Sequence, residues 1–301
     1  EEVLHFVPGG RALGAALTAH PGIAGVAFTG SFETARAIAA VLAQREGPIV
    51  PLIAETGGVN AMVVDSSALT EQVVVDTIQS AFNSAGQRCS ALRLLLLQEE
   101  VAERTLEMLS GAVDELKVGD PLRLDTDVGP LIDEGARERL QTHGARMSRE
   151  ARLVCQAKLP QDADHGCFFA PQVFEIGDPT ILRQEVFGPI LHVARWKAGD
   201  LERVVEAINA TGYGLTLGVH SRLESTVERL LQRARVGNVY VNRNMIGAVV
   251  GCQPFGGEGL SGTGPKAGGP HTLPRYAVER SVCVNTAAAG GNAALLASLG
   301  D

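Results

Sequence analysis

The feature that most constrains the fold is a regular alternation of short apolar runs with longer segments of helical period. Residues 25–28, 92–97 and 190–196 have the apolar or β-branched character of buried strands. Residues 33–44 and 67–84 instead carry apolar side chains at helical spacing. Because strands that alternate with helices are joined by crossovers, the chain is predicted to form an α/β fold with a mainly parallel sheet.

The rest of the chain continues this alternation. Further strands are predicted at 48–54, 61–64, 151–158, 171–176, 215–221 and 239–242, and further helices at 101–116, 129–143, 201–209 and 224–235. Residues 247–269 are rich in Gly and too irregular for a helix, which predicts a functional loop. Residues 277–285 are predicted to form a last strand. Its unpaired edge would seek a partner, so we expect a homo-oligomer.

Composition and charge exclude several classes of protein. Hydrophobic residues make up 45% of the 301 residues, which is ample for a buried core. The longest strongly apolar stretch, 92–97, is interrupted by Arg93 and is far shorter than the roughly 20 residues of a membrane span. The net charge of −8 is dispersed, without a basic tract for nucleic acid. We therefore expect a small-molecule enzyme with no membrane span and no nucleic-acid partner.

The five Cys are scattered, with no metal-ligand spacing among them. This pattern indicates a reducing compartment, the cytoplasm, and no structural metal. Cys155 and Cys283 fall in predicted strands and are expected to be buried. Cys252 lies in the Gly-rich loop, where it could be accessible.

Two strand ends carry residues that could do chemistry. Gly30 and Ser31 join a predicted strand to a predicted helix, where free backbone N–H groups could bind the pyrophosphate of a dinucleotide. Ser31 could equally be an ordinary helix cap. Glu55 follows an apolar strand and precedes Thr56 and two glycines, at the kind of strand end where α/β folds place their sites. By itself, Glu55 is as compatible with a surface carboxylate as with a general base.

Three further stretches have both a chemical and an ordinary interpretation. Cys89 lies between a predicted helix and the next strand, with small or polar neighbours that suit a reactive thiol, although a single Cys is more often structural. Glu185 and Phe187 precede a Gly-Pro turn that could simply stop a helix. Phe255 lies in the Gly-rich loop, where its segment could be only a turn.

Taken together, these stretches resemble the aldehyde dehydrogenase superfamily over essentially the whole chain. Cys89 follows Glu55 by 34 residues, as the nucleophile follows the base in that superfamily. The other segments that resemble it are 117–121, 127–131, 185–189 and 254–257. The resemblance implies an aldehyde dehydrogenase-like fold: a partial Rossmann-type NAD-binding domain (1–57), an α/β catalytic domain (58–275) and a C-terminal oligomerisation strand and tail (276–301).

Longer stretches narrow the resemblance. Residues 81–91 and 247–257 are similar to the pyrroline carboxylate dehydrogenase branch, which oxidises L-glutamate γ-semialdehyde. Residues 258–270 and 285–293 are similar to the C-terminal half of the bifunctional proline utilisation A proteins of bacteria. The resemblance thus implies the second step of proline catabolism, and a proline dehydrogenase domain with its flavin upstream.

The resemblance also implies roles for single residues. Cys89 would attack the aldehyde, NAD would accept the hydride, and Glu55 would activate water to hydrolyse the thioester. The residues implied in cofactor binding are Gly9, Gly30, Ser31, Glu185 and Phe187. The residues implied in substrate binding are Ser90, Gly247, Ala248, Phe255 and Phe82.

The sequence departs from the pattern of the aldehyde dehydrogenase superfamily in one respect, at its amino end. The chain has no initiator Met, and the family's oxyanion Asn and cofactor-binding Lys would lie upstream of Glu1. We therefore expect a fragment of a longer protein that is inactive as given. The alternatives are a general aldehyde dehydrogenase with another substrate and a non-catalytic domain that keeps only the fold. The sequence leaves the choice between NAD and NADP open.

Overall fold

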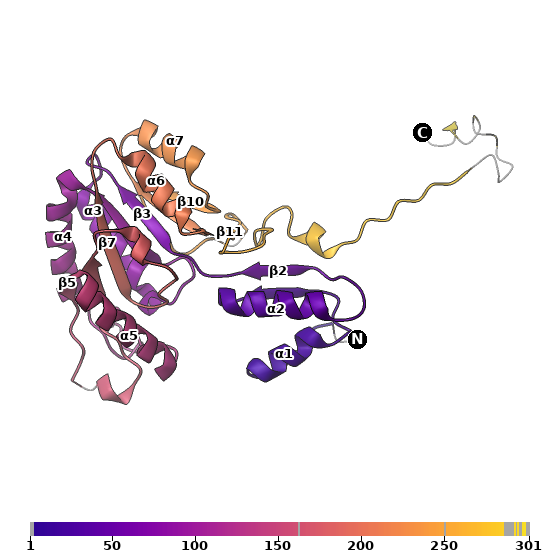
Figure 1. Cartoon of the computed structure of the whole chain (residues 1–301), viewed down its shortest axis with the longest axis horizontal. Helices are drawn as coiled ribbons and strands as arrows, with labels where there is room; N and C mark the ends of the chain where they lie inside the picture. Colours follow the sequence, from indigo (N-terminus) through magenta and orange to yellow (C-terminus); the bar gives the residue numbers. More distant parts are fainter. Residues whose placement is uncertain are drawn as a thin grey trace.

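The main body is built on a seven-stranded sheet. The computed structural model describes residues 3–161, 163–249 and 251–285, together with residues 292, 294, 297 and 298. The strand order is β10-β9-β3-β4-β7-β6-β5 (Figure 1). All neighbouring strands pair in parallel except β5 and β6, which are antiparallel. The prediction of a mainly parallel sheet is confirmed.

The elements of this body follow the predicted alternation. Its strands are β3 (Asn60–Val64), β4 (Leu92–Gln98), β5 (Arg152–Gln156), β6 (Gln172–Glu175), β7 (Ile190–Trp196), β9 (Thr216–His220) and β10 (Asn238–Val241). Its helices are α3 (Thr70–Phe82), α4 (Glu99–Asp114), α5 (Glu134–Glu150), α6 (Leu201–Ala210) and α7 (Glu224–Arg233). A small antiparallel pair joins β8 (Tyr213–Gly214) to β11 (Glu258–Gly259). Short 3-10 turns lie at Asn83–Gly86, Ala163–His165, Pro179–Ile181 and Leu273–Tyr276.

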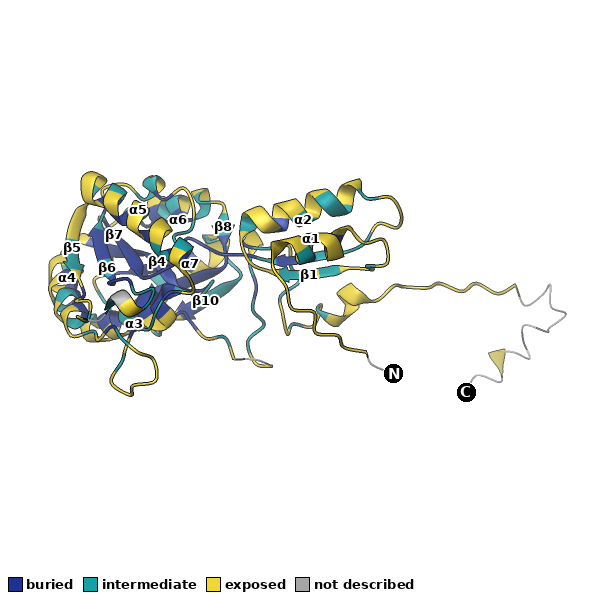
Figure 2. Cartoon of the chain, turned by 90° about the horizontal axis from the view of Figure 1, so that it is seen from below, coloured by how far each residue is buried: buried dark blue, intermediate teal, exposed yellow. Residues whose placement is uncertain are grey.

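The core of the body lies along the central strands. All five residues of β3 and all seven of β4 are buried, as expected for parallel strands that are covered on both faces. Helices α3 and α4 pack on each other and against the sheet. Figure 2 shows this buried sheet between helices whose outer faces are exposed.

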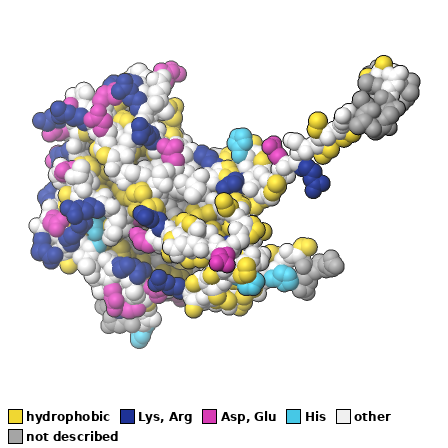
Figure 3. All heavy atoms as spheres, turned by 45° about the vertical axis from the view of Figure 1, so that its right-hand side comes forward, with side chains coloured by type: hydrophobic (Ala, Val, Ile, Leu, Met, Phe, Trp, Pro, Cys, Tyr) yellow, Lys and Arg dark blue, Asp and Glu magenta, His cyan; other side chains and the backbone are white. Residues whose placement is uncertain are grey.

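A smaller N-terminal lobe lies beside the body (Figure 1). It contains α1 (Arg11–Ala19), β1 (Val26–Thr29), α2 (Phe32–Gln44) and β2 (Leu52–Glu55), with β1 and β2 paired in parallel. This β-α-β unit is the architecture expected of a piece of a nucleotide-binding domain. Many apolar side chains of this end of the chain are exposed, among them Val3, Leu4, Phe6 and Ile49. Hydrophobic side chains are correspondingly frequent on the smaller lobe in Figure 3.

Three predictions from the sequence are corrected by the structure. The helix predicted at 129–143 begins later, because the Asp133 side chain caps it by accepting a hydrogen bond from the Ala136 N–H at 2.7 Å. Residues 277–285 form no strand, because they extend away from the body and pair with no neighbouring strand in the described part. For the same reason Cys283 is exposed, and Cys155, which does lie in β5, is only partly buried. Residues 286–291 of the predicted tail lie outside the described residues.

No helix among the described residues is long and apolar enough to cross a membrane.

Candidate active site

Cys89 follows a tight turn at the end of α3. The helix ends at Phe82, and Ser84, Ala85 and Gly86 then adopt left-handed conformations with φ of 55°, 53° and 64°. Such angles are unfavourable for residues with a side chain and are concentrated at functional sites. The turn reverses the chain just before Cys89 and leads it into β4.

Gly86 in this turn cannot be replaced without displacing backbone. A Cβ atom at Gly86 would lie 2.4 Å from the Gly188 carbonyl oxygen, in addition to the strain of its positive φ. We expect Gly86→Ala to lower the free energy of unfolding by roughly 2–4 kcal/mol. Gly111→Ala is the matched control, because a Cβ there meets nothing within 4 Å in helix α4. Gly111→Ala should raise the free energy of unfolding by roughly 0.5–1 kcal/mol. Thermal denaturation compares the two variants, and equal melting temperatures would contradict the strained role of Gly86.

The Cys89 backbone is held by a buried amide. The Asn60 side chain donates to the carbonyl oxygens of Cys89 at 2.7 Å and Ala91 at 2.9 Å. Its own oxygen accepts from the Thr216 N–H at 3.2 Å. Burial raises the pKa of the Cys89 thiol, and the nearby Glu185 carboxylate raises it further. Backbone N–H groups and the Arg93 charge act in the opposite direction.

Glu55 ends β2 and reaches into the Gly-rich loop. Its Oε2 accepts a hydrogen bond from the Gly257 N–H at 3.2 Å. Two more glycines pack against the carboxylate, because a Cβ added at Gly256 or at Gly262 would lie only 3.0 or 2.9 Å from a carboxylate oxygen. Burial raises the pKa of Glu55 to about 7, although Gly257 and the Lys266 charge oppose the rise. The buried Oε1 has no hydrogen-bond partner in the described part of the chain. Glu55 is therefore a carboxylate with a free oxygen and a pKa suited to a general base.

Glu185 and Phe187 approach the same region from the turn before β7. The Arg93 guanidinium donates to Glu185 Oε1 at 3.2 Å and lies 5.4 Å from the centre of the Phe187 ring. Glu185 Oε2 fills the space beside Gly57, where a Cβ would lie only 1.6 Å away. Burial raises the pKa of Glu185, while Arg93 and the Gly58 N–H lower it. The contacts with residues 57 and 58 connect this turn to the segment between Glu55 and Asn60.

The N-terminus of α2 faces this carboxylate region. Ser31 caps the helix by accepting from the Thr34 N–H at 3.2 Å, so the structure supports the capping interpretation of this residue. Glu33 in the first turn is close enough to raise the pKa of Glu185. Gly30 donates its N–H to the Glu55 carbonyl oxygen at 3.1 Å. Gly9 is exposed ahead of α1, where it lies beside Leu13, and among the described residues it forms no backbone hydrogen bond to this region.

The residues expected to bind substrate are in two different environments. Phe82 is only 1% exposed and packs within the hydrophobic core, and Ser90 is buried beside Thr216. Gly247 is exposed and Ala248 half-buried, on the loop that leads toward Cys252. Phe255 is half-buried, and its backbone pairs with Ala267. The structure therefore leaves the loop residues, and not Phe82, open to a ligand.

Three residues of this site were missed by the sequence interpretation: Asn60, Arg93 and Lys266. Asn60 and Arg93 are polar residues in apolar strands, and this signal could have singled them out. Lys266 donates from Nζ to the Gly237 carbonyl oxygen and lies near Glu55. Its position in a Gly-rich segment gave no comparable signal.

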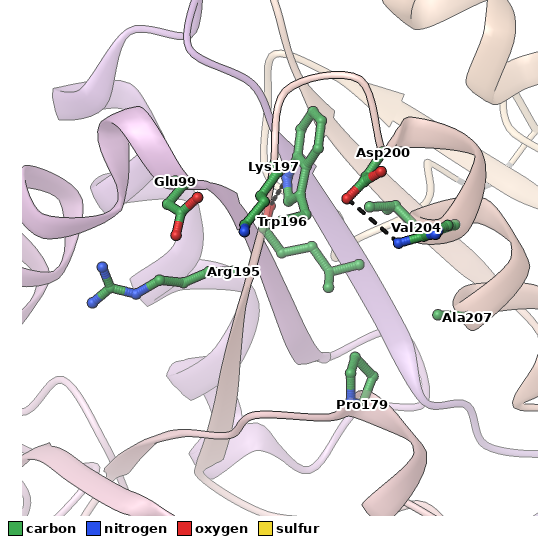
Figure 4. A pocket seen from close by; sticks show the side chains of 10 residues that line it. Glu99, Pro179, Arg195, Trp196, Lys197, Asp200, Val204 and Ala207 are labelled. Atoms are coloured by element: carbon green, nitrogen blue, oxygen red, sulfur yellow. Dashed lines mark hydrogen bonds and ion pairs between the residues drawn. The ribbon is translucent and has the colours of Figure 1, made fainter.

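Two clefts show where a ligand could enter. One, of about 810 Å³, is lined by helix α5 and by residues 183–187, so it opens onto Glu185 and Phe187. The other, of about 290 Å³, has an apolar floor around Trp196, with Lys197 and an Asp200–Arg203 ion pair at its rim (Figure 4). It lies at the carboxyl end of β7, whereas Cys89 precedes the amino end of β4, so it is separate from the thiol. Within the described chain no group of three or more His, Cys, Asp or Glu could hold a metal.

A thiol at a strained turn, a carboxylate with a pKa near 7 and a β-α-β lobe beside a parallel sheet are what an α/β oxidoreductase with covalent thiol chemistry needs. The chain belongs to the aldehyde dehydrogenase family, whose sequence pattern matches residues 1–282.

Named relatives come from two groups within this family. The bifunctional protein PutA of Klebsiella aerogenes is 55% identical over 287 residues, which cover 92% of this chain and 22% of that protein. A crystal structure of a bifunctional proline utilization A protein superposes with a TM-score of 0.90 at 62% identity, covering 94% of this chain and 28% of that one. The 1-pyrroline-5-carboxylate dehydrogenase from Thermus with bound NAD superposes with a TM-score of 0.84 at 35% identity, covering 90% and 53%. The chain thus spans about a fifth of its PutA relative and about half of the Thermus enzyme.

Proposed function

We propose that this chain carries the catalytic thiol and base of an enzyme that oxidises L-glutamate γ-semialdehyde to L-glutamate with NAD, the second step of proline catabolism. The observation that carries the proposal is the similarity, over at least 90% of the chain, to both PutA and 1-pyrroline-5-carboxylate dehydrogenase. The local surroundings of the two residues support it, because Asn60 holds the Cys89 backbone and Glu55 has a raised pKa of about 7 and one oxygen without a hydrogen-bond partner among the described residues.

In the proposed reaction, the Cys89 thiol loses its proton to solvent, and the sulfur forms a bond to the aldehyde carbon as the carbonyl π bond opens onto the oxygen. The oxygen of the adduct carries negative charge, which the Cys89 backbone N–H helps to stabilise. NAD, when bound, accepts the hydride that leaves this carbon, and a thioester on Cys89 remains. Glu55 then removes a proton from water, the water oxygen attacks the thioester, and the acid leaves as the Cys89 thiol is restored.

The described residues fit a dinucleotide. Glu185 Oε1 accepts a hydrogen bond from Arg93, and Glu185 Oε2 lies beside Gly57, two residues after Glu55. In our proposal Glu185 binds the nicotinamide ribose, with the exposed Phe187 ring beside it. The amino end of α2 at Ser31 holds the pyrophosphate through the positive end of the helix, and Gly30, whose N–H is bonded to the Glu55 carbonyl oxygen, lets the pyrophosphate approach the backbone closely. Gly9 lies toward the adenine end.

The substrate's amino acid end is assigned to the loop that carries Gly247 and Ala248. The φ of 78° at Gly247 turns the backbone there, and Ala248, which lacks a polar side chain, offers its N–H to a carboxylate. Phe255 forms an aromatic wall of the same loop. In the proposal, Ser90, which directly follows Cys89, and Phe82, at the end of α3, line the buried side of the site.

The domain boundaries and partners remain part of the proposal. Residues 1–57 form the end of the NAD-binding domain, 58–275 the catalytic domain and 276–301 an oligomerisation segment. Val278, Val282 and Val284 are 95%, 75% and 68% exposed on an extended segment, and such apolar chain seeks a partner. The similarity to PutA supports a proline dehydrogenase domain with a flavin in the same polypeptide. Light scattering on the natural gene product should give an oligomer, and a monomer would contradict the assigned segment.

The substrate is tested by comparing two aldehydes in separate assays. The natural gene product that contains this sequence is supplied with NAD and either glutamate γ-semialdehyde or propionaldehyde, and NADH formation is followed by absorbance. A loop that binds the amino acid end should favour the semialdehyde by at least about 10²-fold in kcat/KM, because an aldehyde without that end leaves its polar groups unpaired. Equal or better use of propionaldehyde would indicate a general aldehyde dehydrogenase. Absence of NAD binding by calorimetry would indicate a non-catalytic domain.

A further inference from the structure

Arg93 is a charged residue near the amino end of the apolar strand β4. It is 1% exposed, and its neighbours Leu92, Leu94 and Leu95 are fully buried. An isolated buried charge is strongly unfavourable, so such a residue persists only where hydrogen bonds and an opposite charge compensate it. The groups that bind the Arg93 guanidinium therefore indicate its structural role.

The Arg93 guanidinium joins two loops that are far apart in the sequence. Nη1 donates to the carbonyl oxygens of Gly86 at 2.7 Å and Gly188 at 3.0 Å. Nη2 donates to the Arg88 carbonyl oxygen at 3.1 Å and to Glu185 Oε1 at 3.2 Å. Two of these acceptors lie within three residues before Cys89, and the other two belong to the turn that carries Glu185.

The local backbone directs Arg93 between these loops. In the β3–β4 ladder Asn60 pairs with Leu92 and Ala61 pairs with Leu94, so the register shifts and leaves Arg93 without a partner in β3. Irregularities of this kind redirect a side chain next to functional sites. On the other side of the strand, His192 Nδ1 lies 3.0 Å from the Arg93 carbonyl oxygen, which fixes the backbone at the same residue.

We propose that Arg93 is a positioning residue that locks the Cys89 loop and the Glu185–Gly188 turn into one fixed arrangement, so that the thiol is held in register with the carboxylate that binds the cofactor. This role rests on the proposed function. The Phe187 ring, 5.4 Å from the guanidinium carbon, extends the same lock to the side chain beside Glu185. Arg93 does not touch the reacting atoms and acts only through the residues that it holds.

Lysine cannot replace this guanidinium. The planar guanidinium of arginine donates from two terminal nitrogens to four acceptors here. The ammonium of lysine has one nitrogen with three donors, so it cannot reach the same set. Arg93→Lys therefore keeps the positive charge near Cys89 and Glu185 but loses the geometry. Arg93→Gln loses both. The pair of variants separates positioning from simple charge.

The first experiment measures steady-state kinetics of these variants in the natural gene product. Arg93→Lys should lower kcat by about 10–100-fold, because small misplacements of reacting groups cost about this much, and should raise the KM for NAD at least about fivefold. Arg104→Lys is the matched control, since Arg104 is an exposed residue of α4 with one ion pair to Glu71, and it should match the wild type. Wild-type kcat and KM in Arg93→Lys would overturn the proposal.

A second measurement does not depend on the dehydrogenase activity. The rate of Cys89 alkylation by iodoacetamide is followed against pH, and its alkaline plateau reports access and geometry because the thiol is fully ionised there. Arg93→Lys should change the plateau at least about threefold relative to the wild type, and an unchanged plateau would overturn the lock. A wild type that forms no NADH, but whose plateau shifts in Arg93→Lys, would refute the proposed function and leave the lock supported.

A third variant covers the case in which Arg93→Lys does not fold, as judged by loss of a cooperative thermal transition. Glu185→Ala removes the acceptor itself, which a glutamine would keep, from the more exposed side of the lock, where the Glu185 side chain is 16% exposed. It leaves the other three Arg93 bonds in place. It should also alter the alkaline alkylation plateau of Cys89 at least about threefold, through the loop that Arg93 joins to it. A plateau equal to that of the wild type would overturn the proposal.

Discussion

Replacing Cys89 by alanine in the natural gene product is expected to lower kcat for NADH formation at least about 10³-fold, because no covalent adduct can form without the sulfur. The loss should appear equally in kcat and kcat/KM, since the thiol acts in the chemical step. NAD binding, measured by calorimetry, should change little, because Glu185 and the α2 terminus remain in place.

Cys155→Ala is the matched control for the thiol. Cys155 lies on β5 at the edge of the sheet and is partly buried, so its loss should leave kcat near the wild-type value. If Cys89→Ala retained substantial activity, the nucleophile would have to be another group. Cys252 would then be the first candidate, because it is exposed in the loop assigned to the substrate.

Replacing Glu55 by glutamine is expected to separate the two halves of the reaction. Acylation of Cys89 still proceeds, so each active site should release about one NADH in a rapid burst. Hydrolysis then lacks its base, and the steady-state rate should fall by about 10²–10⁴-fold. Stopped-flow absorbance resolves the burst from the slow phase, and loss of the burst together with the steady state would place Glu55 in the first half instead.

The pH dependence follows from the same carboxylate. Burial raises the pKa of Glu55 to about 7, and only the ionised form can take a proton from water. The steady-state rate should therefore rise as the pH increases through about 7 and level off above it. In Glu55→Gln this limb should vanish, whereas an unchanged limb would assign it to another group.

The sequence predicted the sheet well because its signals are local. Fully buried strands such as β4 appear as continuous apolar runs, and the intervening helices appear as periodic segments. The helix at 11–19 was missed in a run of Ala and Gly with little polar contrast. The strand predicted at 277–285 could not form by itself, because strand pairing needs a partner that no local pattern supplies.

The residues of the candidate site likewise fall into those that local sequence identified and those that only the fold reveals. Cys89, Glu55 and Glu185 lie in short motifs, so spacing and resemblance were enough to select them. Arg93 gains its meaning only from acceptors as distant as Gly188, 95 residues along the chain. Lys266 likewise acts on Glu55 across the fold. Roles that depend on such long-range contacts were inaccessible to local pattern.

The central claim is that the reaction passes through a thioester on Cys89. Mass spectrometry of the Glu55→Gln variant after brief incubation with glutamate γ-semialdehyde and NAD tests this claim directly. Because acylation outpaces hydrolysis in this variant, the account predicts one acyl group, located by peptide mapping on the peptide that contains Cys89. An adduct on another residue, or NADH formation without any adduct, would contradict it.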